Sequence, residues 1–66
     1  MTALYLHSHM IRGVNIDWFD VDGTVYGLNS ERGITDRYGW EVEMIDANIA
    51  AAILTAKAKL QPETTT

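Results

Sequence analysis

Residues 19–27 read Phe19-Asp20-Val21-Asp22-Gly23-Thr24-Val25-Tyr26-Gly27, and this stretch decides the fold. An Asp-Gly pair between β-rich residues is a strong signal for a hairpin, because both residues tolerate the left-handed backbone of a tight turn. The stretch therefore predicts two antiparallel strands, over residues 14–20 and 24–28, joined at Asp22-Gly23.

Two registers are open for this hairpin. A three-residue loop over 21–23 places Trp18 opposite Tyr26, whereas a two-residue loop over 22–23 places Trp18 opposite Gly27. We expect the three-residue loop, because Trp and Tyr make a better cross-strand pair than Trp and Gly.

Other segments extend this sheet. Residues 3–11 are rich in Leu, Tyr and Ile and contain no Gly or Pro, which favours a first strand. Residues 34–37 and 40–43 flank Tyr38-Gly39, which predicts a smaller hairpin or a strand that ends in a turn.

A helix is expected after Asp46, whose carboxylate can cap the first turn. Apolar residues then recur at helical spacing and should cover the sheet: Ile45, Ile49, Ala52, Ile53, Ala56 and Leu60. The predicted fold class is α+β, with a small antiparallel sheet of three to four strands packed against one C-terminal α-helix. We expect a single compact domain over residues 1–61 and a flexible tail over 62–66.

The other side of this helix is unusually smooth. Its residues, called the alanine face below, are Ala47, Ala50, Ala51, Leu54 and Ala58. Alanines raise helix propensity wherever they stand, but a face of small residues around one leucine also suits self-association. Both interpretations remain open, and the second predicts a homodimer.

Composition narrows the function. The chain has 66 residues and no Cys, which excludes disulfides and thiol chemistry. A domain this small buries only about 60% of its unfolded surface, so self-association is a reasonable source of stability.

The net charge is −4, and the five Lys and Arg residues are scattered. We therefore expect no direct nucleic-acid binding, since phosphate tracking needs clustered cations. The acidic surface either keeps a small protein soluble, the simpler interpretation, or meets a protein partner with a basic surface.

The sequence shows no targeting segment and no apolar run of the roughly 20 residues needed to span a bilayer. We expect a cytoplasmic protein that does not bind membranes.

The run Asp20-Val21-Asp22-Gly23-Thr24 resembles the first motif of the haloacid dehalogenase family. The resemblance implies that Asp20 is a nucleophile, Asp22 a general acid and base, and Mg²⁺ their cofactor. It covers about six residues and lacks the later Lys and acidic pair that this chemistry needs. Asn15 and Asp17 also interrupt the apolar strand that should precede the motif. A metal-dependent phosphohydrolase using Asp20 and Asp22 is therefore kept as an alternative.

Metal binding has two further weak signals. Asp20-x-Asp22-Gly23 is a fragment of the EF-hand alternation without the later bidentate Glu. His7 and His9 would project from the same side of a strand, although two lone histidines are more often ordinary surface residues. We predict no metal site and no cofactor.

The predicted function is that of a non-enzymatic protein-binding module. We expect a small accessory or inhibitory protein, of the kind that mobile genetic elements and phages encode, acting through an acidic, aromatic surface. The predicted partner-binding residues are Asp17, Phe19, Asp20, Asp22 and Tyr38. A structural subunit that assembles through the alanine face is the other alternative.

Overall fold

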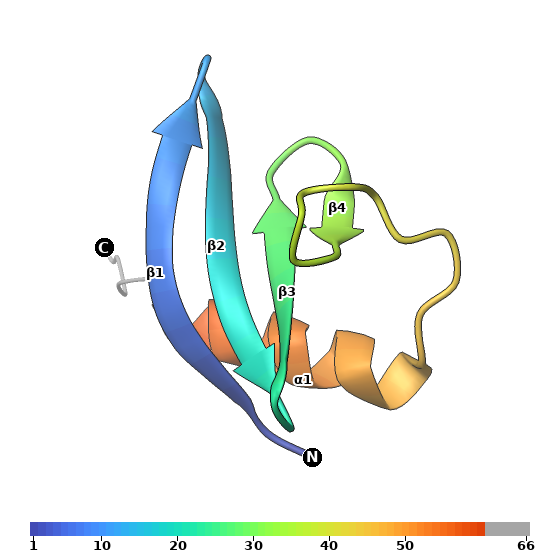
Figure 1. Cartoon of the computed structure of the whole chain (residues 1–66). Coiled ribbons are helices and arrows are strands. Elements are labelled where there is room, and N and C mark those ends of the chain that lie inside the picture. Colours follow the sequence, from blue (N-terminus) through green and yellow to red (C-terminus); the bar gives the residue numbers. More distant parts are fainter. Residues whose placement is uncertain (61–66) are drawn as a thin grey trace.

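A computed structural model describes residues 1–60 of the chain and shows a four-stranded antiparallel sheet with one helix across a face (Figure 1). The strands are β1 (Ala3–Ile11), β2 (Val14–Val21), β3 (Thr24–Asn29) and β4 (Gly33–Thr35), and they lie in the order of the sequence. The helix is α1 (Ala47–Leu60). The predicted α+β class is confirmed, whereas the predicted tail over 62–66 lies outside the described residues.

Two tight turns join the three long strands. Arg12 and Gly13 have φ angles of 52° and 81°, and Asp22 and Gly23 have φ angles of 53° and 89°. Positive φ at both central residues defines the turn that matches the right-handed twist of two antiparallel strands. Both hairpins are therefore closed by two residues.

The expected three-residue loop at the second turn is wrong. Val21 pairs with Thr24, and Trp18 consequently lies opposite Gly27. The pairing of an indole with glycine is favourable here because the Trp18 ring lies against the bare Gly27 backbone. A Cβ at Gly27 would meet Trp18 Cζ3 at 2.8 Å and Thr35 Oγ1 at 2.5 Å.

This register decides which face of the sheet is buried. Phe19 now pairs with Tyr26, and both point toward α1, where Phe19, Val21 and Ile53 form the core. The prediction that Phe19 lies on an exposed face is wrong, since its exposed fraction is 0%. A one-residue change in register moves the side chains of one strand to the opposite face of the sheet. The expected three-residue loop makes this change, because it places Tyr26 on the same face as Trp18 and not on that of Phe19.

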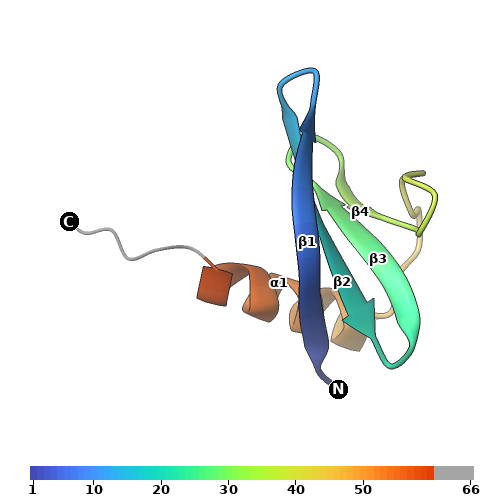
Figure 2. The ribbon, with the colours of Figure 1, turned by 60° about the vertical axis from the view of Figure 1, so that its left-hand side comes forward.

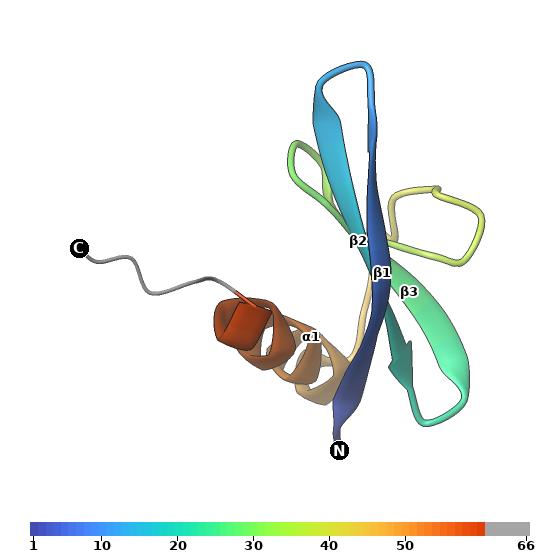
Figure 3. The same cartoon turned by 90° about the vertical axis from the view of Figure 1, so that its left-hand side faces the viewer.

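The helix follows the prediction more closely. Asp46 Oδ1 accepts a hydrogen bond from the amide of Asn48 at 2.7 Å, which is a helix N-cap. Ile53 is fully buried against the sheet, and Ile49 and Ala56 pack beside it. Figure 2 and Figure 3 show that α1 covers one face of the sheet only. In the described part of the chain no helix is long and apolar enough to cross a membrane.

Candidate functional site

The segment that leaves β4 forms a tight loop over residues 36–40, called the Asp36 loop below. The Asp36 carboxylate accepts hydrogen bonds from the amides of Tyr38 at 2.8 Å and Trp40 at 3.0 Å. The Asp36 amide donates to the Trp40 carbonyl at 2.9 Å, and the Gly39 amide donates to the Asp36 carbonyl at 3.1 Å. One acidic residue thus organises the whole loop through its side chain and its backbone.

Two large aromatic side chains project from this ordered loop. Tyr38 and Trp40 are each 74% exposed. The Arg37 guanidinium lies 5.7 Å from the centre of the Tyr38 ring, at cation–π distance. Figure 3 shows the loop on the side of the sheet opposite α1. The loop therefore holds exposed aromatic groups away from the core, on a backbone that is already fixed.

The residues that follow the loop are acidic and exposed. Glu41 and Glu43 are both exposed, and Met44 beside them is 89% exposed. The aromatic pair is thus followed in the chain by two carboxylates and an exposed thioether. This composition suits a partner that combines an apolar pocket with basic residues.

Of the predicted partner-binding residues, Tyr38 lies in the Asp36 loop, and Asp20 and Asp22 lie elsewhere. Asp20 is half-buried, and its Oδ1 accepts a hydrogen bond from the Gly23 amide at 2.8 Å. Asp22 is exposed at the turn itself. Asp20 therefore has a structural role in closing the second hairpin. These acids lie at a hairpin of an antiparallel sheet, whereas the dehalogenase resemblance implies the end of a buried parallel strand.

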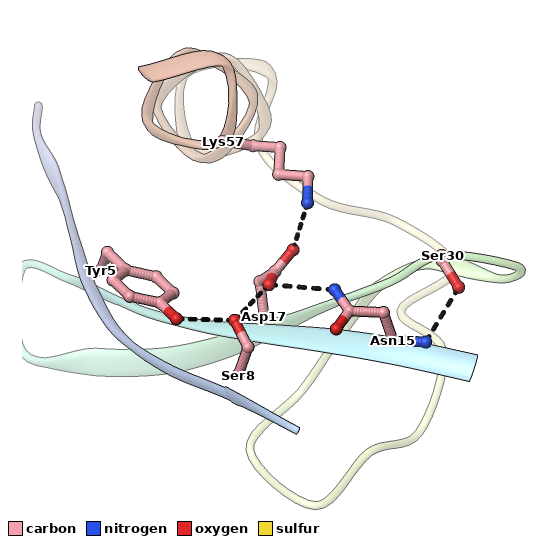
Figure 4. Close-up of polar contacts among 6 residues, drawn as sticks. All are labelled: Tyr5, Ser8, Asn15, Asp17, Ser30 and Lys57. Carbon is pink, nitrogen blue, oxygen red and sulfur yellow. Dashed lines mark hydrogen bonds and ion pairs between the residues drawn. The ribbon is translucent and has the colours of Figure 1, made fainter. Parts of the chain in front are cut away.

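Asp17 is buried, so the expectation that it forms part of an exposed surface is wrong. Its carboxylate is the centre of the cluster drawn in Figure 4. Lys57 Nζ on α1 lies 2.6 Å from Oδ2, while Asn15 donates to Oδ1 at 3.0 Å. The Ser8 hydroxyl on β1 also donates to Oδ1. Tyr5 then shares a hydrogen bond of 2.7 Å with Ser8.

These contacts determine the titration of Asp17. Burial alone would raise its pKa, but the hydrogen bonds from Lys57, Ser8 and Asn15, with the charge of Lys57, outweigh burial and lower the pKa. Both carboxylate oxygens are occupied by partners from β1, β2 and α1. The cluster thus stabilises the packing of α1 on the sheet, so the role of Asp17 is structural.

His7 and His9 lie on the face of the sheet opposite α1, beside Trp18. The Trp18 indole N–H donates to His9 Nδ1 at 3.3 Å, and the His7 and His9 rings stack with centres 6.2 Å apart. The Nδ1 lone pair of His9 is thus engaged by the Trp18 indole in this arrangement. Within residues 1–60, no three His, Asp or Glu side chains gather closely enough to hold a metal ion.

The alanine face is largely open to solvent. Ala47, Ala51, Leu54 and Ala58 are exposed, whereas Ala50 is half-buried. A groove of about 540 Å³ lies beside it, between the start of β1 and α1. Its lining residues are Met1, Thr2, Ala3, Asn48, Ala51, Ala52, Thr55, Ala56 and Lys59. The predicted self-association surface is therefore accessible.

Trp40 is the residue that the predicted site lacked. Trp40 directly follows Tyr38-Gly39 in the sequence. The residue that could have indicated a loop exposing both aromatic residues is Asp36, two residues before Tyr38 and four before Trp40. An Asp at such a spacing can bind following amides and turn the chain back. The structure brings Tyr38 and Trp40 together on that turn.

Comparison with known proteins provides no relative from which a function could be transferred: no family model, curated protein or solved structure matches this chain.

Proposed function

We propose that the protein is a non-enzymatic protein-binding module whose contact surface is the Asp36 loop, with Tyr38 and Trp40 as its anchors. The observation that carries this proposal is that both rings are 74% exposed on a loop whose backbone is held by the Asp36 carboxylate. Binding energy at protein interfaces concentrates in a few large side chains, among which Trp and Tyr are over-represented.

The hydrogen bonds that hold the loop backbone are what separate these anchors from ordinary exposed side chains. Ordering a flexible loop on binding costs free energy, and a loop that is already fixed avoids most of that cost. The Asp36 carboxylate, bound to two amides, fixes the backbone at both anchors.

The partner that fits is a protein with an apolar pocket bordered by Lys or Arg. Glu41 and Glu43 follow the anchors, and the whole chain carries a net charge of −4. Complementary charge raises association rates and selects among partners. The small size, the acidity and the partner chemistry support a narrower proposal, an accessory or inhibitory protein of the kind that mobile genetic elements encode. We place it in the cytoplasm.

The test is quantitative affinity capture from the cells that produce the protein. The wild-type chain is compared with a Tyr38→Ser, Trp40→Ser double variant and with Leu54→Ser, which removes an exposed side chain from the alanine face. We expect one or more proteins to be recovered by the wild type and by Leu54→Ser, and to be lost at least tenfold with the double variant. Circular dichroism confirms that all three chains are folded.

The same comparison discriminates between the alternatives. Recovery that depends on Leu54 and is unaffected by the double variant would assign assembly to the alanine face and overturn the proposal. A Mg²⁺-dependent phosphatase activity that disappears in Asp20→Asn would assign the chain to the hydrolases instead.

A further inference from the structure

The two edge strands, β1 and β4, differ in the pairing of their outer sides. Along the outer side of β4, the Val42 amide donates to the Ile34 carbonyl at 3.1 Å, and Thr35 forms a bridge with Glu41. The chain thus covers the β4 edge with its own backbone. In the described part of the chain, β1 pairs only with β2, which leaves its outer side without a neighbouring strand.

A bulge divides this free edge. Tyr5 pairs with Phe19 and His7 with Trp18, so Leu6 is an extra residue in β1. Bulges twist an edge and interrupt pairing. The segment 7–11 beyond the bulge is uninterrupted, and Figure 1 shows that this end of the β1–β2 hairpin projects past α1. A partner strand could therefore approach segment 7–11 without meeting the helix.

The backbone of this segment presents outward hydrogen-bonding groups at alternate residues. Ile11 and Val14 flank a two-residue turn, and such residues form a hydrogen-bonded pair. The next pair, Met10 and Asn15, is then not hydrogen-bonded. This is confirmed by Asn15, whose carbonyl accepts from the Ser30 amide at 2.9 Å on the side away from β1. The N–H and C=O groups of Met10, and by the same alternation those of Ser8, therefore point outward from β1.

We propose that segment 7–11 of β1 pairs with the same segment of a second copy, antiparallel, about a twofold axis at His9. Ser8 of each copy then lies opposite Met10 of the other, and their outward backbone groups bond to each other. An axis at Met10 would pair Ser8 with Arg12, a residue of the turn, and an axis at Ser8 would pair Met10 with the bulged Leu6. The axis at His9 avoids both and pairs the whole segment.

Charge favours a second copy as the occupant. Eight of the nine acidic residues lie between Asp17 and Asp46, and residues 2–11 contain no Asp, Glu, Lys or Arg. Two copies of an acidic chain can therefore meet along this strand without opposing carboxylates. An antiparallel strand edge is also self-complementary, as an interface between identical subunits requires.

The apolar side chains of the hairpin support the same pairing. Met10 is 66% exposed and Ile11 is 49% exposed. A free strand edge of this kind normally carries Lys or Pro, which block pairing with another chain. In the proposed dimer these apolar side chains would contact side chains of the neighbouring copy across the new strand pair, in a chain whose fully buried apolar residues among those described are Phe19, Val21 and Ile53. This proposal is independent of the Asp36 loop, which follows β4 at the opposite edge of the sheet.

The first test is the mass in solution across a dilution series, measured by sedimentation equilibrium. We expect the chain to approach twice its 7.4 kDa mass as concentration rises. Chemical synthesis allows N-methylation of the Met10 amide, which removes only the outward donor, and this chain should stay monomeric. Leu54→Glu, on the alanine face, should dimerise like the wild type.

A wild-type chain that is monomeric throughout the series overturns the proposal, as does a dimer that survives N-methylation of Met10. If the N-methylated chain does not fold, Met10→Lys replaces it, because a lysine on a strand edge opposes pairing from an exposed side chain. The same two outcomes then apply.

The second test fixes the register. The chain has no Cys, so a single introduced cysteine reports one contact. With the axis at His9, the two His9 residues form a non-hydrogen-bonded pair with Cα atoms about 4.5 Å apart, within reach of a disulfide. His9→Cys should form a covalent dimer under mild oxidation, and Thr55→Cys on the exposed side of α1 should not. Equal cross-linking of both variants would contradict the proposed register.

Discussion

The two edges of this sheet differ in whether another segment of the chain pairs with them. An exposed strand edge offers unpaired backbone groups to any other strand. On the β4 side the chain turns back, pairs Thr35 with Glu41 and, in doing so, builds the loop that exposes Tyr38 and Trp40. On the β1 side, segment 7–11 has no such cover in the described residues. The protected edge thus leads into a loop with exposed aromatic side chains, whereas the free edge exposes backbone groups.

The largest expected effect comes from the residue that lets β4 approach the sheet. Gly27→Val would drive new atoms into Thr35 Oγ1 and the Trp18 ring, which lie 2.5 Å and 2.8 Å from the position of a Cβ. We expect a loss of about 3 kcal/mol in the free energy of unfolding, from overpacking. Urea denaturation measures it, with Thr24→Val, an exposed position on the same strand, as the control. Equal stability of the two variants would show that β4 is not held through Gly27.

The next effect concerns the attachment of α1 to the β1 side. Asp17→Ala would leave the Lys57 ammonium and the Asn15 amide without their carboxylate. We expect a loss of about 2 kcal/mol, the range for hydrogen bonds to a charged group. Glu31→Ala, which removes the same charge from an exposed turn, should change stability by less than about 0.5 kcal/mol. A similar loss in both variants would contradict the role assigned to the cluster.

Asp17 also predicts a pH dependence. Its pKa in the folded chain lies below the ordinary value of an aspartate, so its contribution to stability is fully present above the unfolded value of about 3.9. That contribution is lost as the pH falls from about 4 through the lower folded value. Urea denaturation at a series of acidic pH values should show a steeper decline for the wild type than for Asp17→Ala. Parallel curves would mean that Asp17 does not carry this dependence.

The smallest effect is expected in the Asp36 loop. Asp36→Ala removes the acceptor for the Tyr38 and Trp40 amides, and we expect a loss of about 1 kcal/mol. Asp36→Asn keeps a side-chain oxygen and should retain most of the stability. The sharper measurement is amide hydrogen exchange at Tyr38 and Trp40, which should become much faster in Asp36→Ala alone. Unchanged exchange would show that the loop is ordered by other contacts.

Much of the fold could be predicted from the sequence because its signals are local. The Asp22-Gly23 turn, the Asp46 cap and the apolar spacing from Ile49 to Ile53 each depend on neighbouring residues, and all three are confirmed. The class, α+β with a four-stranded sheet and one C-terminal helix, follows from them.

The register, and with it the buried face, could not be predicted in the same way. Asp22-Gly23 is compatible with a loop of two or three residues, and Trp18 opposite Gly27 looks unfavourable until Thr35 is known to lie on the same spot. The burial of Asp17 depends on Lys57, 40 residues away. Both strand faces carry aromatic residues, so alternation alone could not identify the face that α1 covers.

Amide hydrogen exchange followed by NMR tests the contrast between the two edges most directly, because it reports on both in one sample. At low concentration we expect protected amides at Tyr38 and Trp40 and rapid exchange at Ser8 and Met10. As concentration rises, Ser8 and Met10 should become protected while Tyr38 and Trp40 stay as they were. Rapid exchange at Tyr38 and Trp40, or at Ser8 and Met10 under conditions where the chain is dimeric, would contradict this expectation.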